Sequence, residues 1–168
     1  MIHGSIFVPF FGKEGHLLDK KEVCIVHLQV VRDSGIPYGE MKLDTPGKAA
    51  KVMSEFLGDM DREHVIVCCV DNDLKPTYIQ IAGIGTINAC LVSVPETFKI
   101  AILTNASGLL LFHTHPSGET NPSRDDIAIT RKLREAGSML DIPLQDHIIL
   151  GADNYFSFRE SKFWDAAS

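Results

Sequence analysis

Residues 109–126, which read LLLFHTHPSGETNPSRDD, form the stretch that decides both the fold and the chemistry. An apolar run of strand length ends in two histidines one residue apart, a loop with Pro and Gly follows, and Ser-x-x-Asp then begins an expected helix. Alternate side chains of a strand point to the same face, so we expect His113 and His115 to project together, away from Thr114. Two imidazoles on one face can share a metal ion.

A third ligand must come from outside this strand. Asp126 lies in the first turn of the expected helix, which the loop folds back toward the strand, and we predict that it is this ligand; Asp125 ranks second on spacing. Ser-x-x-Asp is also the spacing of a helix capping box, in which Ser123 caps the helix and Asp126 bonds back to the backbone without any metal. A His-x-His pair alone is often a surface pair. The two patterns in this order, joined by one loop, indicate a metal site far more specifically.

The predicted ligand set is that of a catalytic zinc, with one zinc per chain. Such a zinc commonly takes three protein ligands and leaves a fourth position for water, whose pKa falls to about 7. Hydrolysis also needs a carboxylate base that does not bind the metal, and Glu63, just before an apolar strand, is the candidate. The Ser123 hydroxyl, one helical turn from Asp126, is the candidate donor to the oxyanion. Two histidines and a carboxylate also describe the facial triad of iron oxygenases, but a separate Glu and Ser favour hydrolysis.

Composition limits the class of protein. The chain has 168 residues, 45% hydrophobic and 23% charged, which predicts one compact domain with an extension. No apolar run approaches the roughly 18 residues that span a bilayer, and the four cysteines lack paired C-x-x-C spacing. We therefore expect a cytoplasmic protein with buried, reduced thiols and no membrane partner. The formal net charge of −6 gives no support to a nucleic-acid partner, although a local basic patch is compatible with one.

Helical and strand patterns alternate along the chain and predict an α/β sandwich around one mixed sheet. Residues 1–40 are expected to be an extension that contains a strand over 22–31 and packs on the core, and residues 41–168 the main domain. The expected elements of that domain are a helix capped by Thr45 that ends near Gly58, strands over 65–70 and 77–81, a helix capped by Ser93, the histidine strand, a helix over 124–136 ended by Gly137, strands over 146–150 and 155–158, and a short helix from 161.

Asp146 and His147 form another polar pair, at the start of an apolar strand. They can reach the predicted metal as outer partners of its ligands. A hydrogen-bonded structural role is the preferred interpretation.

The assembled pattern is His113-Thr114-His115, seven residues, Ser123, two residues and Asp126, with a Glu upstream. It resembles the JAMM signature of JAB-domain metalloproteases and, within that superfamily, the bacterial RadC-like group. The resemblance covers about residues 41–160, and its supporting stretches are DREH over 61–64, GTINA over 85–89, VPE over 94–96, HPSG over 115–118, PSRDD over 122–126 and LQDHII over 144–149.

The resemblance implies a JAB fold, in which helices flank a mixed sheet in a layout related to cytidine deaminases. It implies a zinc held by His113, His115 and Asp126, with Glu63 deprotonating the water and Ser123 stabilising the tetrahedral intermediate. Relatives in the wider superfamily cleave peptide or isopeptide bonds, so a protein or peptide substrate is expected.

Two other functions stay open beside the hydrolase. The RadC-like group is traditionally labelled as DNA repair, so one alternative is a repair or mobile-element factor. The other is a non-catalytic JAB-fold binding module with an unused metal site. The sequence leaves the oligomeric state open.

Overall fold

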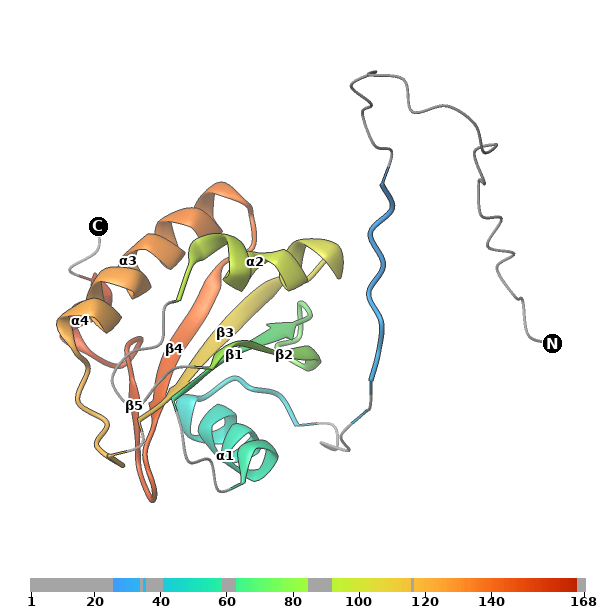
Figure 1. Ribbon diagram of the computed structural model, residues 1–168. Helices are drawn as coiled ribbons and strands as arrows, with labels where there is room; N and C mark the ends of the chain where they lie inside the picture. The colour runs from blue at the N-terminus through green and yellow to red at the C-terminus, as the bar shows by residue number, and fades with distance from the viewer. Residues whose placement is uncertain are drawn as a thin grey trace, which may run out of the picture.

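The computed structural model describes residues 26–33, 35, 41–58, 63–84, 92–115 and 117–165. Within these ranges a mixed sheet with strand order β2-β1-β3-β4-β5 lies between helices on both faces (Figure 1). Its strands are β1 (His64–Val70), β2 (Pro76–Ile84), β3 (Gly108–Thr114), β4 (Leu144–Leu150) and β5 (Tyr155–Ser157), and the helices are α1 (Pro46–Leu57), α2 (Val94–Leu103), α3 (Arg124–Met139) and α4 (Lys162–Asp165). The predicted α/β fold, a mixed sheet flanked by helices, is confirmed.

The centre of the sheet is β3, which lies antiparallel to β1 and parallel to β4. All residues of β1 are buried, as its apolar, β-branched sequence predicts for a strand covered on both faces. Parallel neighbours need a crossover connection, and α3 supplies it between β3 and β4. The chain therefore leaves the end of β3, passes through the loop and enters α3, which brings the first turn of α3 near the last residues of β3.

Each face of the sheet has its own apolar cluster. Helix α1 covers one face, where Met53 packs with Phe112 of β3, while α2 and α3 cover the other, where Phe98 and Leu133 pack with Leu111 (Figure 1). Side chains alternate along a strand, so His113 shares the α2/α3 face with Leu111. The histidine therefore projects toward the side of the sheet on which α3 begins.

Local signals in the sequence explain where the first two helices begin. The Thr45 side chain accepts a hydrogen bond from the Lys48 amide at 3.4 Å, and Ser93 accepts one from the Glu96 amide at 3.3 Å. Both predicted caps are confirmed.

The predicted end of α3 at Gly137 is wrong, because the helix continues to Met139. A Cβ atom at Gly137 would lie 2.7 Å from the Ile142 carbonyl oxygen and 3.1 Å from the Leu144 nitrogen. The glycine therefore lets the chain entering β4 pass close against the helix, a tertiary role that local sequence patterns do not reveal.

The strand predicted over 22–31 is wrong over its described part. Residues 26–33 form no strand, and Val26, Leu28 and Val31 are 72% to 77% exposed. A strand needs a neighbour for its backbone hydrogen bonds, so β propensity alone does not make one. The rest of that strand and residues 1–25 lie outside the described residues, and an extension packed on the core stays a prediction.

Two further expectations concern the cysteines and the membrane. Cys68 and Cys69 are free and buried, and burial raises their pKa values to about 12 and about 11, so both thiols are protonated. Cys24 and Cys90 lie outside the described residues. Across the described ranges, no helix has the length and apolar character that crossing a membrane requires.

Asp146 is a buried carboxyl on β4 that links this strand to β5 and to the residues after it. Its Oδ2 accepts a hydrogen bond from the Ser157 hydroxyl at 2.6 Å, and its Oδ1 accepts one from the Arg159 amide at 2.9 Å. Burial raises the pKa of Asp146 to about 6, although these hydrogen bonds oppose the shift. The structural role preferred for Asp146 agrees with these contacts.

We predict that Asp146→Asn removes a pH-dependent term from the stability. The folded protein keeps the Asp146 proton to a higher pH than the unfolded chain, so the stability from the protonated carboxyl is present below about pH 4 and lost as pH rises through about 6. The unfolding free energy of the unmodified protein relative to the variant should fall by about 2–3 kcal/mol between pH 4 and pH 7, since one pKa unit corresponds to about 1.4 kcal/mol. Urea titrations in a chelator measure this difference, and a difference that does not vary with pH would contradict it.

Candidate metal centre

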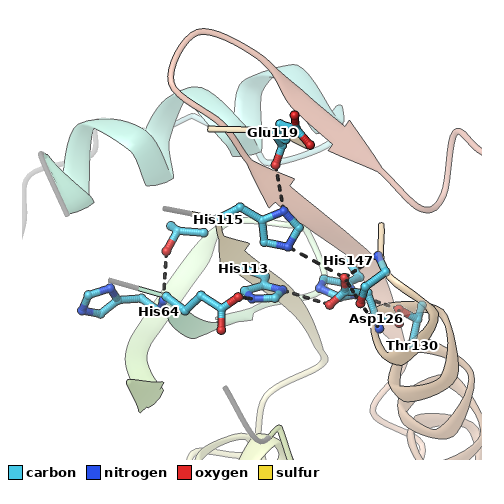
Figure 2. Close-up of polar contacts among 10 residues, drawn as sticks. His64, His113, His115, Glu119, Asp126, Thr130 and His147 are labelled. Atoms are coloured by element: carbon cyan, nitrogen blue, oxygen red, sulfur yellow. Dashed lines mark hydrogen bonds and ion pairs between the residues drawn. The ribbon is translucent and has the colours of Figure 1, made fainter. Parts of the chain in front are cut away.

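Three of the predicted site residues, His113, His115 and Asp126, lie together at the end of β3 (Figure 2). His113 is the penultimate residue of β3, and His115 lies one residue past the strand end at Thr114. Glu63 precedes β1, whose Val65 pairs with His113, so the antiparallel register brings it to the same edge. Asp126 comes from the first turn of α3. Four residues from three separate segments thus converge.

The two imidazoles are held nearly perpendicular, with ring centroids 4.7 Å apart. His113 Nδ1 lies 3.1 Å from Asp126 Oδ1, and His115 Nδ1 lies 2.7 Å from the Glu119 carbonyl oxygen. Both oxygens can only accept, so each Nδ1 carries a proton and Nε2 is the ring nitrogen left for a metal. Metal-bound histidines typically hold their other N–H in this way, against a carboxylate or a carbonyl.

The Asp126 carboxylate links the helix to both histidines. Its Oδ2 accepts from the Ser123 amide at 2.8 Å and from the Ser123 hydroxyl at 2.6 Å, while the Asp126 amide donates to that hydroxyl at 3.1 Å. The capping box is therefore confirmed, and the same Oδ2 lies 3.8 Å from His115 Nε2. Asp125 is exposed, whereas Asp126 is 6% exposed, which separates the two candidates that sequence spacing left open.

Asp126 is ionised in this setting. Burial raises the pKa of this carboxyl, but hydrogen bonds from His113 and Ser123 outweigh that effect and hold the pKa well below its usual range. A permanently charged, buried carboxylate beside two imidazoles suits a cation.

Glu63 faces His113 from the other side. Its Oε1 lies 3.6 Å from His113 Nε2, and its Oε2 is buried without a hydrogen-bond partner. Glu63, His113 and His115 each offer a ligand atom within 4.8 Å of the others, which makes them a candidate metal-binding group. Asp126 instead meets the Nδ1 side of His113. Which of the two carboxylates binds the metal stays a prediction.

The residues present fit a divalent metal such as zinc. Among the described residues, the buried side-chain atoms without a hydrogen-bond partner are Glu63 Oε2, His113 Nε2, His147 Nε2 and Gln80 Oε1, and the first three belong to residues in or beside this site. A buried lone pair without a donor is costly, and a cation satisfies it. Imidazole and carboxylate are common zinc ligands.

The sequence did not predict one feature of the site and left another open between two interpretations. The Glu119 contact to His115 uses a main-chain carbonyl, which has no signature in the sequence. His147 was expected either as an outer partner of the ligands or, by preference, in a hydrogen-bonded structural role, and it shows both features: its ring centroid lies 6.3 Å from that of His113, and its Nδ1 lies 2.7 Å from Thr130 Oγ1.

In the parallel pairing of β3 with β4, Ile149 is the partner of His113, and His147 lies two residues before Ile149. The side chains of His147 and His113 therefore lie on the same face of the sheet. Strand alternation is the sequence pattern that could have predicted this nearness.

Comparison with known proteins identifies the domain type. A family model described as the RadC-like JAB domain matches residues 43–163. Relatives named UPF0758 protein include one from Roseiflexus castenholzii, 36% identical over 71% of this chain and 51% of its own length, and one from Thermotoga maritima, 40% identical over 71% of this chain and 53% of its own. The chain thus spans about half the length of these relatives.

Ser123→Ala, with Ser93→Ala as its control, separates capping from a role at the metal. Both serines cap a helix, so each variant should lose about 1 kcal/mol of unfolding free energy. Only Ser123 also contacts the Asp126 carboxylate, so we expect Ser123→Ala alone to weaken zinc binding, by about 10-fold or more. Urea titration and chelator competition measure the two effects. Unchanged zinc affinity in Ser123→Ala would show that Ser123 does not support metal binding through Asp126.

Proposed function

This chain belongs to the family of RadC-like JAB domains, and from that premise we propose that it is a zinc-dependent hydrolase of peptide or isopeptide bonds. The observation that carries the proposal is the group of Glu63, His113 and His115, of which His113 is buried and the other two partly buried, and whose ligand atoms lie within 4.8 Å of one another. Because the chain spans about half of its relatives, the activity, substrates and partners of the whole protein are part of the proposal.

We assign His113, His115 and Asp126 to the zinc. His115 Nε2 lies 3.8 Å from Asp126 Oδ2, and hydrogen bonds keep this carboxylate ionised. For His113 Nε2 and Asp126 to bind one metal, Asp126 Oδ1 has to leave His113 Nδ1, which it contacts at 3.1 Å. When bound, zinc would supply a Lewis acid that polarises the scissile carbonyl and lowers the pKa of a water molecule. Asp126 also fixes the orientation of the His113 ring, so it serves the site even before a metal binds.

Glu63 is assigned as the general base. Its Oε2 has no hydrogen-bond partner and is therefore free to take a proton from water. An amide nitrogen leaves only after it is protonated, and a carboxylate that has taken the proton can return it there. A base of this kind suits amide cleavage. Ser123 is assigned to oxyanion stabilisation, which requires its hydroxyl to leave the Asp126 carboxylate during the reaction.

A peptide or protein substrate fits the charge better than nucleic acid does. The formal net charge of −6 repels phosphates on average. The loop beside His115 is exposed at Ser117 and Glu119, and we propose that it contacts the substrate.

Exchanging the two carboxylates for amides should distinguish their roles. We expect Asp126→Asn to lose zinc, because the neutral amide lacks the negative charge that attracts the cation. Glu63→Gln should retain about one zinc per chain and lose turnover by about 100-fold or more, because a glutamine cannot take a proton. Elemental analysis of protein purified with and without oxygen measures zinc and iron together. Zinc lost from Glu63→Gln but kept by Asp126→Asn would reverse the assignment.

Hydrolysis is tested with a peptide library made from a digested bacterial proteome. Zinc-loaded protein should generate new N-termini from these peptides, and free lysine ε-amines from lysine isopeptides added to the library, both detected by mass spectrometry, and the Glu63→Gln protein should generate neither. A lack of new amines at full zinc occupancy would overturn the proposal. Labelled duplex DNA in the same buffer at low and at physiological salt tests the repair alternative, for which we expect no anisotropy change.

A further inference from the structure

His147 is a buried imidazole on β4 to which the proposed reaction assigns no role. It is 1% exposed, and its ring lies almost parallel to that of Phe158, with centroids 4.8 Å apart and an interplanar angle of 7°. On the other side the His113 ring lies 6.3 Å away at 16°. The histidine therefore stands between the aromatic core and a proposed metal ligand.

A short chain of hydrogen bonds connects His147 to the helix that carries Asp126 (Figure 2). The Thr130 hydroxyl donates to the Asp126 carbonyl at 2.6 Å, and Thr130 Oγ1 lies 2.7 Å from His147 Nδ1. The hydroxyl has only one proton. Both contacts are satisfied together when His147 Nδ1–H donates to Thr130, which leaves the lone pair on Nε2.

This chain of contacts returns to the site. Thr130 lies one helical turn beyond Asp126, and the Asp126 carboxylate holds His113 Nδ1 at 3.1 Å. His147 thus fixes the start of α3 through Thr130 and lies against the His113 ring from β4. A shift of that helical turn would move the Asp126 carboxylate away from both histidines. Mutation of a residue that holds a metal ligand in place typically lowers metal affinity by about 10- to 100-fold.

We infer that His147 and Thr130 are positioning residues of the metal centre, which set the place of Asp126 relative to His113. The inference rests on the proposed function in so far as that function assigns a metal to these ligands. Thr130 and His147 are both buried, so they act through the residues that they contact. Their effect is on how well the apo protein is arranged to receive the cation.

Thr130→Val is the sharpest test, because valine has nearly the same shape and lacks the hydroxyl. Its control is Ser157→Ala, which removes the buried hydrogen bond from Ser157 to Asp146. Asp146 precedes His147 on β4, so its side chain lies on the opposite face of the sheet. Both variants should lose stability in urea titrations. Competition with a chromophoric zinc chelator should show a loss of zinc affinity of about 10-fold or more for Thr130→Val and less than about twofold for Ser157→Ala.

A second pair of variants examines the histidine itself. His147→Asn keeps an N–H donor near the position of Nδ1, whereas His147→Leu keeps only apolar volume. We expect zinc affinity to fall further in His147→Leu than in His147→Asn. Amide hydrogen exchange of the apo proteins gives a readout without metal, and exchange over residues 126–130 should be faster in Thr130→Val than in Ser157→Ala.

The outcomes distinguish the inference from the proposed function. If Thr130→Val matches Ser157→Ala in zinc affinity and in exchange, the inference is overturned, even if the protein cleaves peptides. If Thr130→Val weakens zinc binding but no amide bond is cleaved, the inference stands and the proposed function fails. If the unmodified protein binds no zinc, both are overturned.

Discussion

One buried carboxylate connects the parts of this site. Asp126 accepts two hydrogen bonds from Ser123 on one oxygen and contacts His113 with the other, so a single charge caps α3 and orients a side chain at the end of β3. Burying such a charge is costly unless every oxygen is paired. The start of α3 is therefore held next to the end of β3. The residue that holds it there, in the connection between β3 and the parallel strand β4, is the same residue that we assign to the metal.

The sequence predicted the parts that depend on local rules. Strand alternation placed His113 and His115 together, and the Thr45 and Ser93 caps were correct because capping needs only neighbours in the chain. Glu63 was predicted as the base from its place before an apolar strand and from the larger pattern that the family resemblance supplies. The physical cause of its convergence with the histidines is the pairing of β1 with β3, a contact between segments about fifty residues apart that no local pattern specifies.

What the sequence missed depends on tertiary contact. Gly137 has the residue type of a helix end, yet it lies within α3 because the chain before β4 passes against it. Val26 to Val31 has strand composition but forms no strand. His147 looked like a structural histidine, and its link to Asp126 through Thr130 exists only once α3 packs on β4. In each case the deciding neighbour is distant in the sequence.

The hydrogen bond from His115 to the Glu119 carbonyl has a consequence for how the loop can change. The contact uses the main chain, so the side chain at position 119 is exposed and free to vary, while the backbone there is constrained by a proposed metal ligand. Substitutions that alter what the loop recognises are therefore compatible with an intact centre. Insertions or deletions between residues 115 and 119 are not, because they would displace the carbonyl. Diversity in this loop should accumulate as changes of side chain at constant length.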